Sequence, residues 1–391
     1  MLNNIQTIII TAAILLAIII AIACVSSCNG KKKEMENRTN AYQWEPMASA
    51  PVKFPIEVLG ADFVLDRTDQ GKLHVEELSI FGNPTLHQGI AQGFCGAAYD
   101  EDRKVRLPRG IDALWLSYTE RKVYSLYADL PFEQMEDLFA KGYERYDSNG
   151  VLKQEKFESL DLCFLPKGVV VLYAKGIART ILLDWSALGQ ETNEFDEEIC
   201  KEKRAESINE LVDWTLEHNP GMVVDKDLPA DSLLSKYFER FNYRINVAFE
   251  DERSSIFISS CNFTNAERIS VRYKSMDNGI KRPARLKDYE LLWNCDGYQY
   301  DAYFYFNEEE SLRLFDEAFG ENRKEKEGTL DVKVSKYNNL FEISLNVDDK
   351  KILFEKTEIR VFRAPLPDVR GNWELIYKNY EGDHQNILRI E

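Results

Sequence analysis

Residues 111–139 have the sequence IDALWLSYTERKVYSLYADLPFEQMEDLF, and this stretch decides the fold class. Two runs within it, 111–118 and 123–130, are rich in aromatic and branched residues, which predicts two strands. Pro131 then opens a predicted short helix and Gly142 ends it, because proline suits the first helical turn and glycine suits the C-terminal cap. The stretch therefore combines two strands with a short helix.

Strand-like runs continue on both sides of this stretch. The turn Pro166-Lys167-Gly168 separates two of them and predicts a β-hairpin. Two later stretches, 193–218 and 230–241, keep apolar residues near helical spacing and predict helices. The flanking predicted strands are 54–59, 61–65, 73–81, 157–165, 168–174 and 179–185.

The second half of the chain repeats this order of features. Leu292-Trp293 corresponds to Leu114-Trp115, and in both halves a strand and then a helix follow. Asn307 and Glu310 supply a predicted N-cap and third-position pair for the second helix. Either a duplication or the chance recurrence of a common strand and helix unit accounts for this series.

These patterns predict an α+β fold of antiparallel β-rich sheets with short packing helices, in two related domains. We expect a first β-rich domain at 42–190, a helical connector at 191–241 and a second β-rich domain at 242–391. A signal or anchor segment at 1–28 and a polar tether at 29–41, without periodic apolar positions, precede them.

The N-terminus carries a long apolar run. Residues 8–25 have no charged side chain, and the run approaches the ~20 residues that a membrane-spanning helix needs. Val25-Ser26-Ser27-Cys28 places small side chains before a cysteine, as a lipoprotein signal peptidase requires. We therefore expect a lipid on Cys28, with Cys24 as the second choice, and a mature protein anchored in the bacterial cell envelope on the periplasmic side.

The charges around the apolar run support an alternative. Residues 1–7 contain no Lys or Arg, whereas Lys31, Lys32 and Lys33 follow the run. An uncleaved helix with this pattern would place the rest of the chain in the cytoplasm. A cytoplasm-facing single-pass membrane protein therefore stays open.

Composition and motifs exclude several functions. The chain has 66 acidic and 49 basic residues, a net charge of -17, and no basic stripe that could neutralise nucleic-acid phosphates. No two of its four histidines have the spacing of a helical metal site, and it contains no Cys-x-x-Cys, Gly-x-Ser-x-Gly or phosphate-loop motif. We expect neither a metal nor a cofactor.

The cysteines beyond Cys24 and Cys28 do not resemble a disulfide framework. They are an odd set at irregular spacing, which favours buried small apolar side chains. A disulfide between Cys261 and Cys295 stays open, because both lie in strand-like segments.

A dense aromatic run in the second half is the candidate partner surface. Trp293, Tyr298 and Tyr300 precede Phe304 and Phe306, and alternation along a strand would place several of these rings on one face. Such a face could stack on a sugar or a peptide. The alternative, which we favour, is that these rings belong to the core.

Several motifs of the first half recur together in a known pattern. They are Tyr42-Gln43-Trp44, Ser49-Ala50-Pro51, Phe54-Pro55-Ile56-Glu57-Val58, Leu107-Pro108, Leu114-Trp115-Leu116-Ser117-Tyr118, Tyr124, Leu130-Pro131, Leu138-Phe139 and Pro166-Lys167-Gly168-Val169-Val170-Val171. This set resembles the uncharacterised bacterial lipoprotein family catalogued as domain of unknown function 2931. The resemblance covers residues 42–185 and leaves the second half outside it. It implies an envelope lipoprotein and supports Cys28, and it implies no activity.

The sequence thus predicts a lipid-anchored, non-enzymatic module that binds a protein or glycan partner through a β-rich surface. An acidic surface would suit a basic partner, and neutralising a toxin in the envelope is one such function. A hydrolase of envelope polymers that uses paired carboxylates is the enzymatic alternative, because acidic runs such as Glu308-Glu309-Glu310 are frequent.

Overall fold

The computed structural model confirms a β-rich α+β fold. It describes residues 40–382 except 52, 66–71, 76–77, 81–91, 97–103, 220–221, 223, 225–230, 274–279 and 322. The chain divides into two compact units. The smaller unit contains β7 (Lys104–Arg106) and all but the last residue of β1 (Ala41–Gln43), and these two strands pair. All other elements that follow belong to the larger unit.

Two sets of strands form the first half of the larger unit. In the first set, β2 (Glu45–Pro51) pairs in parallel with β12 (Ser159–Phe164), which is followed by β13 (Val169–Gly176) and β14 (Arg179–Leu188). The second set has the order β3 (Ile56–Val64), β8 (Gly110–Ser117), β9 (Lys122–Asp129) and β15 (Gln190–Thr192). Further short elements are β4 (Lys72–Val75) and β5 (Leu78–Ile80) on β3, β6 (Gln92–Gly96) on β2, the 3₁₀ turn η1 (Pro166–Gly168), helix α2 (Phe132–Lys141), and the pair β10 (Tyr143–Tyr146) and β11 (Leu152–Glu155).

The second half repeats the same pairing scheme. Its first set is β16 (Tyr243–Phe249), parallel to β21 (Gly328–Val334), then β22 (Phe341–Val347) and β23 (Lys350–Leu353). Its second set is β17 (Ser255–Phe263), β19 (Leu286–Cys295), β20 (Tyr298–Tyr305) and β24 (Glu358–Pro365). Helix α6 (Glu308–Phe319) follows β20 as α2 follows β9. The repetition predicted from the sequence therefore appears in the order of strand pairing.

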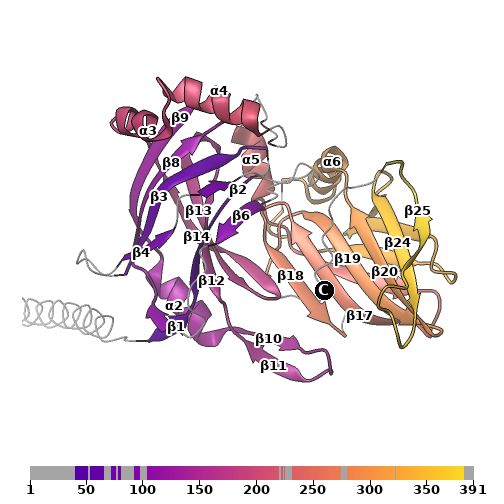
Figure 1. Cartoon of the computed structure of the whole chain (residues 1–391). Coiled ribbons are helices and arrows are strands. Elements are labelled where there is room, and N and C mark those ends of the chain that lie inside the picture. The colour runs from indigo at the N-terminus through magenta and orange to yellow at the C-terminus, as the bar shows by residue number, and fades with distance from the viewer. Residues whose placement is uncertain are drawn as a thin grey trace, which may run out of the picture. The chain divides into compact units, whose positions relative to one another are not determined.

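One sheet contains strands of both halves. β14 pairs with β18 (Arg268–Arg272), which also pairs with β17, so the first set of the first half continues into the second set of the second half. β25 (Glu374–Lys378) adds an edge strand beside β24, and β18, β19, β20 and β24 can be followed in Figure 1. The complete sheet has eleven strands.

The two tryptophans of the repeat occupy equivalent core positions. Trp115 is paired across strands with Tyr124 and stacks on it with ring centroids 5.5 Å apart. Trp293 is paired with Tyr300 and stacks on it at 5.1 Å. Both indoles are fully buried. Each half therefore builds its core around the same cross-strand aromatic pair.

The predicted turns and caps are confirmed with adjusted bounds. β12 and β13 form the expected antiparallel hairpin, with Gly168 at φ +75° in its turn. The Asn307 side chain accepts a hydrogen bond from the backbone N–H of Glu310 at 3.0 Å and caps α6. The two strands predicted at 54–59 and 61–65 are the single strand β3, which continues through a register shift between Val58 and Gly60.

The helical stretch after β15 differs from the single run that the sequence predicts. It forms α3 (Asp196–Lys203) and α4 (Ile208–His218), because Arg204 adopts a left-handed conformation and the Ser207 side chain caps the next helix. Helix α5 (Asp231–Tyr237) follows. Helices α3 and α4 pack on Leu116, Tyr118 and Val123 and so cover part of β8 and β9.

Candidate functional site

Four turns meet at one end of the second half. The side chains of Arg253 and Asp296 form an ion pair of 2.8 Å between two of them. The backbone N–H of Leu366 donates to the carbonyl of Gly297 at 2.8 Å and connects a third. The backbone N–H of Lys336 donates to the Glu250 carboxylate at 3.1 Å and connects the fourth. These turns are 250–254, 296–297, 335–340 and 366–373.

Large apolar side chains are exposed on these neighbouring turns. Tyr337 is 78% exposed and Leu340 is 63% exposed, and Tyr298 and Leu366 are each 38% exposed. Burying such side chains on association is favourable, and clusters of them mark interaction sites more often than isolated ones do. We call these four residues the turn-end surface.

Buried contacts hold the turn-end surface in place. The Trp293 indole N–H donates to the side-chain oxygen of Asn338 at 3.0 Å, and Asn338 itself is 4% exposed. Asn338 has φ +57°, a conformation that asparagine tolerates better than most residues. Tyr337 and Leu340 therefore project from a turn whose middle is fixed to the core.

Charged side chains surround the turn-end surface. Arg253 donates to both carboxylate oxygens of Asp251, at 3.0 and 2.7 Å. These charge-assisted hydrogen bonds hold the pKa of Asp251 well below its usual range, so the pair stays ionised. Lys333 and Glu250 add an exposed ion pair of 3.0 Å. Apolar tips next to charged groups resemble the core and rim of a protein interface.

The structure separates the three aromatic residues that the sequence singles out. Trp293 and Tyr300 are buried and belong to the core with Phe304 and Phe306. Tyr298 is accessible, and the Arg363 guanidinium lies 5.0 Å from its ring centroid. The three rings lie next to one another: Tyr300 stacks on Trp293 with centroids 5.1 Å apart, and the Tyr298 ring lies 6.5 Å from that of Tyr300. The accessible ring is therefore backed by the two buried rings.

Sequence reasoning missed Tyr337, Leu340 and Leu366. A signal was present, because Tyr337 and Leu340 stand in the polar stretch Ser335-Lys336-Tyr337-Asn338-Asn339-Leu340, where a turn offers no core to enter. Only the fold places this turn against Trp293, near the end of β19 that leads into the turn at 296–297.

The same end of the first half is arranged differently. There the turn between β8 and β9 carries Arg121, whose guanidinium bonds Asp213 at 2.5 Å and the carbonyl of Asn209 at 3.3 Å, both in α4. Tyr118 in that turn is buried against α3 and α4. The equivalent turn of the second half, 296–297, is held instead by Arg253. The protein therefore covers the first end itself and presents the second.

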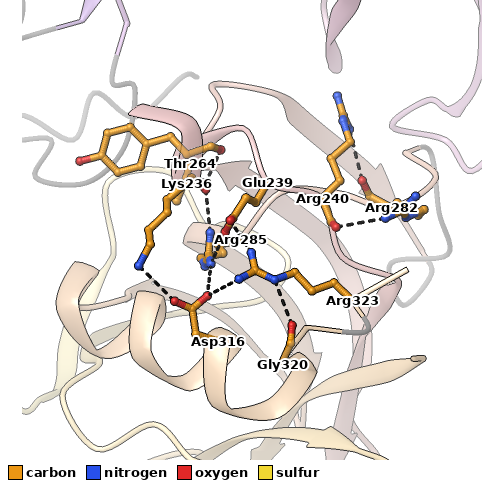
Figure 2. Close-up of polar contacts among 10 residues, drawn as sticks. Lys236, Glu239, Arg240, Thr264, Arg282, Arg285, Asp316, Gly320 and Arg323 are labelled. Atoms are coloured by element: carbon orange, nitrogen blue, oxygen red, sulfur yellow. Dashed lines mark hydrogen bonds and ion pairs between the residues drawn. The ribbon is translucent and has the colours of Figure 1, made fainter. Parts of the chain in front are cut away.

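An ion network next to α5 and α6 has the geometry of a structural centre. Arg285 is completely buried, donates to the carbonyl of Lys236 at 2.6 Å and bonds Glu239 and Asp316 at 2.6 and 2.8 Å. Arg323 contacts the same two carboxylates, and Lys236 pairs with Asp316 (Figure 2). Because its carboxylates and cations pair with one another, this network joins α5, α6 and the segment before β19.

Cys261 and Cys295 lie in β17 and β19. Cys261 and Cys295 are buried free thiols, and burial raises the pKa of Cys261. Cys24 and Cys28 lie outside the described residues. Within the described ranges, no three His, Cys, Asp or Glu side chains are grouped to hold a metal ion, and no helix is long and apolar enough to cross a membrane.

Residues 31–213 match the model of the family described as Protein of unknown function (DUF2931), which confirms the resemblance of the first half. The match ends within α4, so β16 to β25 and the turn-end surface lie beyond it. No curated protein and no solved structure matches the chain.

Proposed function

We propose that this protein is a lipid-anchored binding module of the bacterial cell envelope that captures a protein partner through the turn-end surface. The observation that carries the proposal is the exposure of Tyr298, Tyr337, Leu340 and Leu366 at three adjoining turns, 296–297, 335–340 and 366–373. Loops fixed on a rigid β scaffold are a common solution for recognition, since the scaffold limits the entropy lost on binding.

The exposed side chains of the turn-end surface and the net charge of the chain indicate the kind of protein that would bind. Tyrosine and leucine tips favour burial against an apolar patch, with charged groups forming the rim. The net charge of -17 favours association with a basic protein at low salt. A basic toxin that must be neutralised in the envelope is a concrete partner of this kind.

The anchor is part of the proposal. A lipid on Cys28 and the polar stretch 29–41 would hold the folded part near a membrane and let it turn toward a partner. Intact mass of membrane-extracted protein tests this: loss of residues 1–27 and a gain of acyl mass are expected, and Cys28→Ala should abolish both while Cys24→Ala retains them. A full-length, unacylated chain would instead support the cytoplasm-facing alternative.

The hydrolase alternative is less well supported by the geometry. Asp301 accepts a hydrogen bond from the Tyr303 hydroxyl at 3.0 Å, and Glu290 is the cross-strand neighbour of Tyr303. The two carboxylates thus lie on one face of one sheet, whereas glycoside hydrolysis needs them on either side of the scissile bond. The arrangement favours binding over bond cleavage.

The binding claim is tested with paired variants. Tyr337→Ser/Leu340→Ser removes the two most exposed tips without touching a buried group, and Tyr127→Ser is the control, because Tyr127 is 70% exposed on β9 in the first half. Partners that co-purify with the wild type after mild crosslinking should be lost from the first variant and kept by the second. Equal recovery from both variants would remove the turn-end surface from the proposal.

A further inference from the structure

A row of polar side chains crosses the second half on the face of the sheet that points away from its core. Directly paired residues of adjacent strands share a face, so the register alone defines this row. Core residues such as Leu291 and Phe304 alternate with it on the opposite face. The row consists of Ser270, Ser260, Glu290, Tyr303, Arg360 and Lys378.

Neighbouring positions extend the row into a polar face. Ser260 and Ser270 share a hydrogen bond of 2.7 Å, and the Gln299 amide donates to Asn294 at 3.1 Å. The Arg360 guanidinium lies 4.8 Å from the ring centroid of Tyr303. Hydroxyl, amide, carboxylate and guanidinium groups are thus combined with aromatic rings on one surface, which we call the polar face.

In the first half, the sheet face that corresponds to the polar face is covered by helices. Leu116 and Val123, next to the Trp115–Tyr124 pair, are buried under α3 and α4. At the equivalent positions beside Trp293 and Tyr300, the second half has Asn294 and Gln299. Where the first half has apolar residues packed under α3 and α4, the second half has hydrogen-bonding residues. These suit a polar ligand and not a packed helix.

The backbone narrows the class of ligand. β17, β19, β20 and β24 are each paired on both sides, so their main-chain groups are used within the sheet. A peptide cannot add to them as a further strand, and a ligand must be recognised by side chains and ring faces. Sugar rings present hydroxyl groups and an apolar C–H face together, which matches both kinds of group.

The charges of the polar face balance. Four acidic residues face four basic ones, so the face as a whole does not select a cation or an anion. We propose that the polar face binds a neutral oligosaccharide, with Glu290 and Arg360 bonding its hydroxyls. The eight charged residues are Asp288, Glu290, Asp301 and Glu358 against Arg268, Arg272, Arg360 and Lys378.

The accessible groups agree with such a ligand. Glu290 and Arg360 are half-buried, whereas Tyr303 and Asp301 are buried beneath them. Burial raises the pKa of Glu290, so its carboxylate is incompletely solvated. Ser260 and Tyr303 lie within hydrogen-bond reach of this carboxylate, and hydroxyl donors from a sugar would add further hydrogen bonds to it.

Calorimetry with the detergent-solubilised full chain tests the proposal, with maltohexaose, cellohexaose and chitohexaose as probes. At least one probe should bind saturably. Glu290→Gln and Arg360→Gln should each weaken that binding by about tenfold or more, as expected for a hydrogen bond to a charged group. Thermal melting checks that both variants are folded.

Tyr337→Ser is the matched control, because it changes the turn-end surface and leaves the polar face intact. Its sugar binding should equal that of the wild type, which makes this result independent of partner capture. The proposal is overturned if none of the three probes binds, or if folded Glu290→Gln and Arg360→Gln bind sugar as well as the wild type does. Binding of oligolysine in place of the sugars would also overturn it.

Discussion

The buried indole N–H of Trp293 donates a hydrogen bond to the side chain of Asn338, which lies in an otherwise exposed turn. A residue of the core thereby fixes a turn that carries two exposed apolar tips. The equivalent tryptophan of the first half, Trp115, is instead packed so closely that a Cβ on Gly189 would lie 2.3 Å from its ring. One repeated core position thus stabilises a surface turn in one half and a close chain crossing in the other.

Removing the side chain of Asn338 should destabilise the protein. Asn338→Gly leaves the buried indole N–H without its partner, which costs about 1–3 kcal/mol, while glycine tolerates the positive φ. Urea unfolding measures this loss. Asn339→Gly makes the same exchange at the exposed neighbouring position and should change the free energy of unfolding by at most about 0.5 kcal/mol. Equal losses in both variants would contradict the assigned contact.

Gly189→Ala should destabilise the first half. The added methyl group would meet the Trp115 ring at 2.3 Å, and the buried indole cannot move aside without disturbing its stack on Tyr124. Overpacking of this kind costs about 1–3 kcal/mol. Gly60→Ala is the control, since nothing lies within 4 Å of its added Cβ. Equal melting temperatures for the wild type and both variants would contradict the close packing of Gly189 against Trp115.

The ion network should depend on its buried member. Arg285→Ala leaves Glu239 and Asp316 with fewer cations and the carbonyl of Lys236 without its donor, so a loss of about 3 kcal/mol is expected. Arg313→Ala removes an exposed helix ion pair with Glu317 and should cost no more than about 0.5 kcal/mol. Comparable unfolding midpoints for the two variants would show that Arg285 does not hold α5 and α6 together.

Glu290 should give a defined pH dependence. Burial raises the folded pKa of its carboxyl above the ordinary value of 4.5, so the folded state binds the proton more tightly than the unfolded state does. The bound proton stabilises the folded wild-type protein at low pH. This contribution to the free energy of unfolding is lost as the pH rises above about 4.5 and through the folded pKa of Glu290.

Glu290→Gln, which cannot ionise, should gain stability relative to the wild type as the pH increases from 4 to 7. Urea unfolding at both pH values measures the difference. A constant difference between the two proteins, or one that shrinks toward pH 7, would contradict the raised pKa.

The fold could be predicted from the sequence where local signals dominate. Pro131, Gly142 and Asn307 mark helix ends through backbone geometry that few other residues provide, and the structure has helix ends close to all three. Leu114-Trp115 and Leu292-Trp293 pointed to equivalent strands because large rings need an equivalent core. These features depend on a few neighbouring residues, so they can be inferred without the tertiary structure.

Long-range relationships were beyond such signals. The parallel pairing of β2 with β12 joins segments about one hundred residues apart, and nothing local specifies its register. The split between α3 and α4 depends on Arg204 in a left-handed conformation, which its sequence does not announce. The turn-end surface and the polar face likewise form only when three or more separate segments come together.

Site-specific photocrosslinking in living cells tests most directly whether the turn-end surface captures a partner. A photoreactive phenylalanine analogue replaces Tyr337 in one protein and Tyr127 in another, and both positions are highly exposed. We predict a discrete high-mass adduct from position 337 and none from position 127. No adduct at position 337, or the same adducts at both positions, would contradict partner capture through this surface.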